Sequence, residues 1–258
     1  MHSTEEKLKA FERLLEIMDE LREKCPWDRE QTLDSLRNLT IEETYELADA
    51  IMDQDLNEIR KELGDLLLHI VFYAKIGSEK GAFDIADVLN GINEKLVFRH
   101  PHVFGDRAVK DSGEVIENWE ELKMKEGNRS VLSGVPVSLP AMIKSHRIQD
   151  KVRAVGFDWD HRDQVWDKVI EEIHEVKHEL NNGQDKEKME DEIGDLLFSV
   201  VNAARLYDIE PETALERTNR KFIKRFKYLE AKALESGRSL KEMSLQEMEA
   251  IWQEAKSI

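Results

Sequence analysis

The chain has 258 residues and one cysteine, and its formal net charge is −17, with 36% charged and 40% hydrophobic side chains. The single cysteine excludes an internal disulfide and a four-cysteine zinc site, and so acidic a composition opposes direct binding to nucleic acid. No apolar run approaches the roughly 18 residues of a membrane span and no secretory signal is evident, which predicts a cytoplasmic protein that does not enter a membrane.

Hydrophobic residues recur at helical spacing along most of the chain, and no segment alternates as a strand would. Thr40 is expected to cap the first clear helix, and Pro211 to lie in the first turn of the last. With only 12 glycines and 5 prolines to interrupt the helices, the predicted fold class is all-α. In chain order, helices are expected near residues 41–52, 63–74, 87–98, 165–180, 189–206 and 211–234.

The chain contains an internal repeat. Residues 41–74 and 170–204 both read I-E-E-x-x-E, then a short polar stretch, then E-[LI]-G-D-L-L with an apolar continuation. The dipeptide Trp-Asp precedes each copy, and a spacing of about 130 residues is too long for a solenoid. We therefore expect two tandem homologous helical-bundle domains, over residues 1–126 and 141–258, joined by a Gly/Ser/Pro-containing linker at 127–140.

Each copy carries acidic residues on helices that are otherwise apolar. At about 100° per residue, Glu62, Asp65 and His69 share one arc of a helix that the sequence predicts to be buried nearly all round. Buried carboxylates are costly unless they are paired or bind a metal, and ligation by oxygen alone favours Mg²⁺ or Mn²⁺ over zinc. If the first two helices of a copy pack antiparallel, four carboxylates converge. They are Glu43, Glu46, Glu62 and Asp65 in the first copy, and Glu172, Glu175, Glu192 and Asp195 in the second.

The third predicted helix of the second copy is basic, although the protein is acidic. The first copy offers only Lys95 and Arg99 at the matching place. Near a cluster of metal and carboxylates, such side chains would bind phosphate oxygens, so the second copy is predicted to be better equipped for a polyphosphate. The alternative is a solvated basic face. The cationic residues of the second copy are Arg217, Arg220, Lys221, Lys224, Arg225 and Lys227.

These motifs, together with CPWDREQTLDSL at 25–36, HPHVFGD at 100–106, NWEELKMKE at 118–126 and VGFDWD at 155–160, resemble the two-domain MazG proteins of the all-α nucleoside triphosphate pyrophosphohydrolases. The resemblance covers nearly the whole chain. It implies Mg²⁺-dependent hydrolysis of ribo- or deoxyribonucleoside triphosphates to monophosphate and pyrophosphate, with broad base tolerance and Mn²⁺ as a substitute metal. It also implies house-cleaning of nucleotide pools, a homodimer, and a second domain that is the main catalytic one.

The resemblance also implies residue roles. Trp159, like Trp27, is a candidate to stack on the base, and the alternative is a tryptophan that plugs the bundle. In the second copy the metal ligands and catalytic acids would be Glu172, Glu175, Glu192 and Asp195. The further catalytic acid Glu171 would lie behind these ligands or help to position water, and phosphates would be bound by Asn219, Lys221 and Arg225. In the first copy the same pattern gives Glu43, Glu46, Glu62 and Asp65, with Glu42, Asn93, Lys95 and Arg99.

Two other interpretations stay open. Glu171 with His174 and Glu175 with His178 have the Glu-x-x-His spacing of di-iron bundles, but both pairs lie on one predicted helix. The other alternative is a helical nucleotide sensor or interaction module that binds nucleotides through a metal without turning them over. Bound iron would distinguish the first alternative, and binding without product release would distinguish the second.

Overall fold

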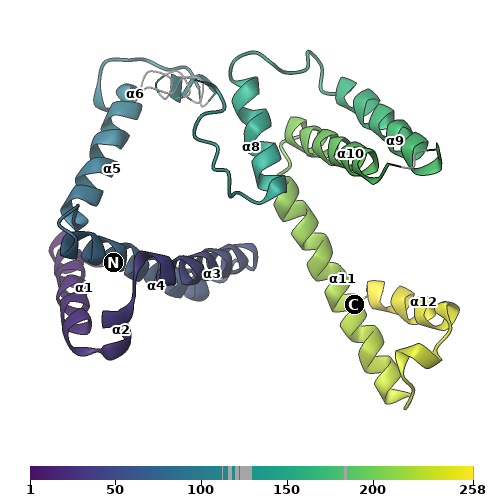
Figure 1. Ribbon diagram of the computed structural model, residues 1–258, viewed down its shortest axis with the longest axis horizontal. Helices are drawn as coiled ribbons and strands as arrows, with labels where there is room; N and C mark the ends of the chain where they lie inside the picture. The colour runs from purple at the N-terminus through teal and green to yellow at the C-terminus, as the bar shows by residue number, and fades with distance from the viewer. Residues whose placement is uncertain (112, 116–117, 120–121, 123–129, 183–184, 258) are drawn as a thin grey trace. The chain divides into compact units, whose positions relative to one another are not determined.

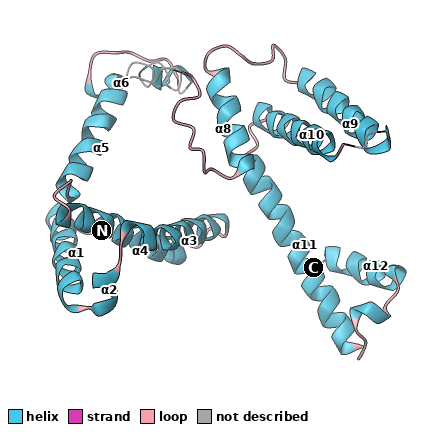
Figure 2. Cartoon of the chain, viewed as in Figure 1, coloured by secondary structure: helices cyan, strands magenta, loops and turns pink. Residues whose placement is uncertain are grey.

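The computed structural model describes residues 1–111, 113–115, 118–119, 122, 130–182 and 185–257. Helices joined by short loops make up this part of the chain, and it contains no β-strand, which confirms the all-α fold class (Figure 2). The chain divides into two compact units, residues 1–108 and 109–258. The predicted boundary at residue 126 and most of the motif at 118–126 lie outside the described residues, so the predicted domain limits stay predictions.

Unit 1 contains the first copy of the repeat. Helices α3 and α4 pack against each other, and α1 packs on α4 (Figure 1). Asp55 begins α4 because its side chain accepts hydrogen bonds from the backbone N–H groups of Asn57 and Glu58. The helices are α1 (Thr4–Lys24), α2 (Pro26–Glu30), α3 (Leu33–Met52), α4 (Leu56–Glu79), α5 (Ile85–Arg99) and α6 (Pro101–Phe104).

The predicted start of α3 is wrong by two turns. Thr32 is the N-cap: its hydroxyl accepts from the Ser35 N–H at 3.1 Å, and the Ser35 hydroxyl accepts from the Thr32 N–H at 2.9 Å. Thr40 lies inside the helix, where its hydroxyl donates to the Leu36 carbonyl at 3.0 Å. The helix therefore begins where the reciprocal pair at Thr32 and Ser35 satisfies its first backbone donors, and Thr40 has no capping role.

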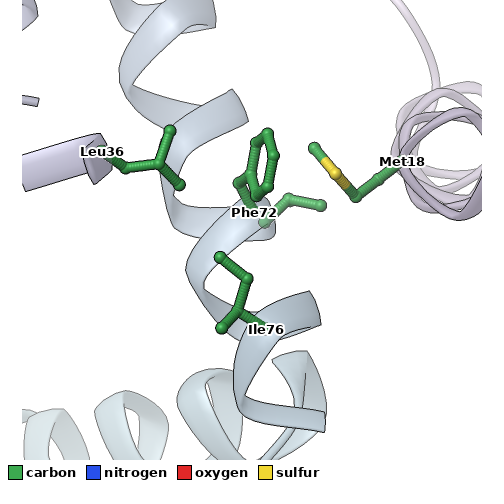
Figure 3. Packing of buried hydrophobic residues seen from close by; sticks show 5 residues of the cluster. Met18, Leu36, Phe72 and Ile76 are labelled. Atoms are coloured by element: carbon green, nitrogen blue, oxygen red, sulfur yellow. The ribbon is translucent and has the colours of Figure 1, made fainter. Parts of the chain in front are cut away.

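The core of unit 1 is a compact apolar cluster. Met18 of α1, Leu36 of α3 and Phe72 and Ile76 of α4 converge, as Figure 3 shows, and each is at most 3% exposed. These side chains come from three different helices and meet only because the helices pack together. The cluster fills the space between the helices at one end of the α3–α4 pair.

Unit 2 repeats the helical pair. The helices α9 and α10 pack closely, α8 packs on α10, and α11 contacts α8, α10 and α12 (Figure 1). Val165, Val169 and Ala203 form its buried core cluster. Pro211 lies in the first turn of α11, as predicted. The elements are α8 (Ala141–Arg153), α9 (Gln164–Asn182), α10 (Lys186–Leu206), α11 (Pro211–Glu235), η1 (Leu240–Glu242), α12 (Leu245–Glu254) and η2 (Ala255–Ser257).

The acidic helices are not buried all round, contrary to the prediction. Leu63 on α4 is 52% exposed and Leu197 on α10 is 55% exposed, and each has exposed apolar neighbours on its own helix. Within one chain, only the sides of α4 and α10 that face neighbouring helices are covered. An apolar helix face is expected to be buried, but its composition does not show whether the same chain or a second chain covers it. None of the described helices is long and apolar enough to cross a bilayer.

Candidate functional site

Three carboxylates of the second copy converge between α9 and α10. Glu172 extends from α9, Glu192 and Asp195 extend from α10, and one oxygen from each lies within 4.8 Å of the others. Glu172 is only 4% exposed. The convergence follows from the sequence pattern because residues three apart on α10 share a helix face, and that face packs on α9.

The first copy builds the same cluster. Glu43 of α3 and Glu62 and Asp65 of α4 bring carboxylate oxygens within 4.8 Å of one another. Glu46 and Glu175 are not among these closest trios, but each interacts electrostatically with them. Desolvation and then the charge of Glu46 raise the pKa of Glu62, and desolvation and then the charges of Glu172 and Glu192 raise the pKa of Glu175. The structure thus brings together the acidic residues predicted in both copies.

The carboxylates of the first copy oppose one another's ionisation. Desolvation raises the pKa of Glu43 above its ordinary value, and the charges of Asp65 and Glu46 raise it further. Desolvation also raises the pKa of Glu62, ahead of its neighbours' charges. One oxygen of Glu62, Oε2, is buried and has no hydrogen-bond partner among the described residues. A cation bound to this oxygen would relieve both the desolvation and the repulsion, so the donor set fits a metal.

The chemistry of the donors indicates the kind of metal. Every member of both trios is a carboxylate, and carboxylate oxygens are the preferred ligands of hard divalent cations such as Mg²⁺ and Mn²⁺. Neither trio includes a histidine, although His174 and His178 lie on α9 beside the second one. The described residues therefore do not form the mixed histidine–carboxylate set of a di-iron site.

A lysine that the sequence analysis did not single out neutralises part of the second cluster. Lys168 Nζ lies 2.7 Å from Glu172 Oε1 and 2.9 Å from Glu171 Oε1. These two carboxylates raise the pKa of Lys168 well above its ordinary value, so it remains charged. In the sequence, Lys168 precedes the two acids by three and four residues, and this helical spacing could have predicted both ion pairs. The first copy has Leu39 at the matching position of α3 and thus lacks this charge.

A cavity of about 710 Å³ opens beside the second cluster, between α8, α9 and α10. Glu172 and Asp195 line one part of it, and aromatic side chains including Trp159 and Phe198 line another. A second hollow of about 680 Å³ lies along α9, where Glu175 and Glu192 contribute to its lining. The carboxylates of the second copy therefore contribute to the lining of two hollows, and the first is within the size range of small-molecule sites.

A buried ion pair closes the polar end of the cavity. The Arg205 guanidinium is 4% exposed and donates from Nη1 to Asp158 Oδ2 at 3.0 Å. It also donates to Asn202 Oδ1 from Nε at 3.0 Å and from Nη2 at 2.8 Å. This pairing helps to lower the pKa of Asp158 against the desolvation that would raise it, and fixes the segment before Trp159 to α10.

The corresponding space in the first copy is filled. Phe72 occupies the helical position that Asn202 occupies in the second copy, and it is 2% exposed between Met18 and Leu36 (Figure 3). Met18 lies on α1, which packs on α4 as α8 packs on α10. The two copies therefore share a carboxylate cluster and differ in the space next to it.

The predicted phosphate-binding residues are not brought to the cluster within one chain. Asn219, Lys221 and Arg225 lie on α11, and no residue of α11 lines either hollow. Asn219 instead donates from Nδ2 to Glu216 at 3.2 Å. In the first copy Lys95 and Arg99 lie on α5, outside the carboxylate trio. Trp159 does line the cavity, whereas Trp27 is 55% exposed on α2.

Fold and site together define an all-α protein with duplicated carboxylate clusters, one of them beside a cavity. A family model described as the MazG nucleotide pyrophosphohydrolase domain matches twice, over residues 31–104 and 162–229. These matches cover more than half of the chain, and the second spans α9, α10 and most of α11. The chain belongs to the MazG family of nucleotide pyrophosphohydrolases.

Three bacterial proteins are similar to this chain over nearly its whole length, and two of them carry the name nucleoside triphosphate pyrophosphohydrolase. The chain is 43% identical over 257 residues to a nucleoside triphosphate pyrophosphohydrolase of Escherichia coli K12, covering 96% of this chain and 98% of the relative. It is 41% identical over 251 residues to a Thermotoga maritima protein named nucleoside triphosphate pyrophosphohydrolase/pyrophosphatase MazG, covering 95% of each. It is 46% identical to an uncharacterized Bacillus subtilis protein, YabN, covering 98% of this chain and 53% of that protein.

Proposed function

We propose that the second copy hydrolyses nucleoside triphosphates to the monophosphate and pyrophosphate with Mg²⁺, for which Mn²⁺ is a substitute. The observation that carries this proposal is that Glu172 and Asp195 belong both to the carboxylate cluster and to the lining of the 710 Å³ cavity. A nucleotide seated in that cavity places its phosphates beside the site for the cation. The first copy has the cluster, but apolar side chains fill the adjoining space.

The chemistry follows from the donors present. A divalent cation held by Glu172, Glu192 and Asp195 would supply positive charge to the phosphate oxygens and acidify a water molecule. Glu171, whose side chain is 56% exposed beside the cluster, orients the water that attacks the α-phosphorus. As the new P–O bond forms, the α–β phosphoanhydride breaks and its electron pair leaves with pyrophosphate. The water's proton passes to a carboxylate.

Phosphate binding by Asn219, Lys221 and Arg225 is proposed for an assembled homodimer. These residues share α11 with the exposed apolar side chains of Phe222 and Ile223, which are 56% and 50% exposed. A second chain that covers this apolar surface would bury it and bring the basic residues of one chain toward the cluster of the other. The α11 residues would then stabilise charge on the departing pyrophosphate.

We propose broad tolerance of base and sugar, and with it a house-cleaning role in nucleotide pools. The cavity is lined by Trp159, Phe157 and Phe198, and stacking on aromatic rings does not select among bases. The net charge of −17 makes free nucleotides better substrates than nucleic acid, because a polyanion is repelled unless a basic surface receives it.

A product assay tests the reaction. Phosphorus NMR of a panel of triphosphates is expected to show monophosphate and pyrophosphate with Mg²⁺ and no turnover with EDTA. Asp195→Ala is expected to lower kcat/KM by more than about a hundredfold, since even supporting residues around a metal contribute tenfold to a hundredfold. The matched change in the first copy, Asp65→Ala, is expected to leave most of the activity.

Three outcomes would contradict the proposal. Diphosphate with orthophosphate would show that a different bond is cleaved. Full activity in Asp195→Ala would remove the second cluster from the reaction. Metal-dependent binding of triphosphates with no product would favour the sensor interpretation.

A further inference from the structure

One amide at the cavity has an unused hydrogen-bond acceptor. Gln149 of α8 is 3% exposed and lines the cavity, and its Nε2 donates to the Phe198 carbonyl on α10 at 2.9 Å. A carbonyl oxygen only accepts, so this bond fixes which end of the amide faces α10. The other end, Oε1, is buried and has no hydrogen-bond partner in the described part of the chain.

Such an arrangement is unusual for a residue that serves packing alone. A buried acceptor without a donor weakens the fold, and most buried polar atoms in folded proteins are paired. A methionine of nearly the same shape would fill the site without leaving that oxygen unpaired, and the first copy has Met18 buried on the corresponding helix. The second copy carries an amide, which a ligand with an N–H donor would satisfy.

A second amide lies at the polar end of the cavity. Asn202 lines the cavity, and its Oδ1 accepts two hydrogen bonds from Arg205. The cavity therefore combines aromatic walls at Trp159 and Phe198 with the unpaired acceptor of Gln149. Apolar cavities with a few fixed polar groups are typical sites for planar heterocyclic ligands.

We propose that this cavity receives the nucleobase and that Gln149 is a specificity-determining residue, whose Oε1 accepts a hydrogen bond from an N–H group of the base. The proposal rests on the function proposed above, because the phosphates of the same nucleotide lie at Glu172 and Asp195. Each of the common bases has an N–H group: the amino groups of adenine and cytosine, the amino and ring N–H of guanine, and the ring N–H of uracil and thymine. A single acceptor thus admits all of them and selects against a ligand without such a group.

The test uses three ligands. AMP carries an exocyclic amino group on its base, and purine riboside 5′-monophosphate differs from it only in having hydrogen in place of that group. Ribose 5-phosphate has no base. Calorimetric titration of the full chain with Mg²⁺ is expected to give affinity in that order. Gln149→Met is expected to weaken AMP by about tenfold, to the level of purine riboside monophosphate, and to leave the other two ligands unchanged.

Controls separate this role from a structural one. Gln246→Met makes the same substitution at an exposed position of α12 and is expected to change none of the three affinities. Equal loss for all three ligands in Gln149→Met would overturn the proposal, as would an unchanged preference for AMP. If that variant does not fold, wild-type protein that binds AMP and purine riboside monophosphate equally overturns the proposal without it.

The outcome is independent of hydrolysis. Wild-type protein that releases pyrophosphate from ATP but does not distinguish AMP from purine riboside monophosphate overturns the role of Gln149 and leaves the proposed reaction. Protein that makes this distinction but yields no monophosphate from any triphosphate overturns the reaction and leaves the base site.

Discussion

At the scale of one residue, Glu62 shows how clustered carboxylates destabilise the folded state. Its pKa is raised by desolvation, and then by the charges of Glu46 and Asp65. In the unfolded chain its pKa is ordinary, so the folded state holds the proton more tightly, and the charged group weakens folding above pH 4.5. Stability is lost as the pH rises from that value through the raised pKa, and the loss then levels off.

This sign gives a prediction for Glu62→Gln. Without metal, the variant is expected to have a higher Tm than wild type, and the gain is expected to grow with pH across that window. Thermal denaturation in EDTA between pH 4 and 8 would measure it. Glu23→Gln, at an exposed position of α1, should show no such trend. A gain that is largest at low pH would contradict the electrostatic account.

At the scale of the element, Phe72 of α4 fills the space beside the carboxylate cluster of the first copy. The ring is 2% exposed and packs with Met18 and Leu36, and its centroid lies 5.5 Å from the Arg22 guanidinium carbon. Phe72→Ala is expected to lower the free energy of unfolding by about 3–5 kcal/mol, because it removes buried surface and leaves a void.

Urea denaturation followed by circular dichroism would measure this loss. Leu56→Ala, on the same helix at a position 79% exposed, is expected to stay within about 0.5 kcal/mol of wild type. A cost below about 1 kcal/mol for Phe72→Ala would show that the helices relax into the space and that the closure is weak.

The existence of the helices could be predicted from the sequence, but not all of their limits. Hydrophobic periodicity located the central turns of α3, α4, α9 and α10. It missed the first two turns of α3, because these begin with a local hydrogen-bond exchange at Thr32 and Ser35 and not with an apolar stripe. It also overstated burial, since an apolar face has the same pattern whether its cover comes from the same chain or from another.

At the scale of the whole molecule, the exposed apolar faces lead to a prediction about assembly. Light scattering is expected to give twice the chain mass of 30.1 kDa. Leu197→Glu, on the exposed face of α10, is expected to shift the protein to monomer, because an unpaired charge would be buried at the contact. Val137→Glu, at a position 91% exposed, should leave the dimer intact. A monomeric wild-type protein would contradict this assembly.

The candidate site was predictable where it depends on spacing and unpredictable where it depends on packing. Glu172, Glu192 and Asp195 follow from a duplicated motif on two helices. Gln149 belongs to no motif, and its role depends on the Phe198 carbonyl, which is 49 residues away in the chain. The contacts of the α11 residues with phosphate remain a prediction, because a single chain does not bring them to the cluster.

The packed space around Phe72 has an evolutionary consequence for the duplication. To open a cavity like that of the second copy, the first copy would have to replace both Phe72 and Met18 with smaller or polar residues. Replacing only one of them would leave a void or an unpaired polar group in the core, and both are destabilising. Single substitutions therefore meet a stability barrier between the two packings, even though both copies retain their acidic residues.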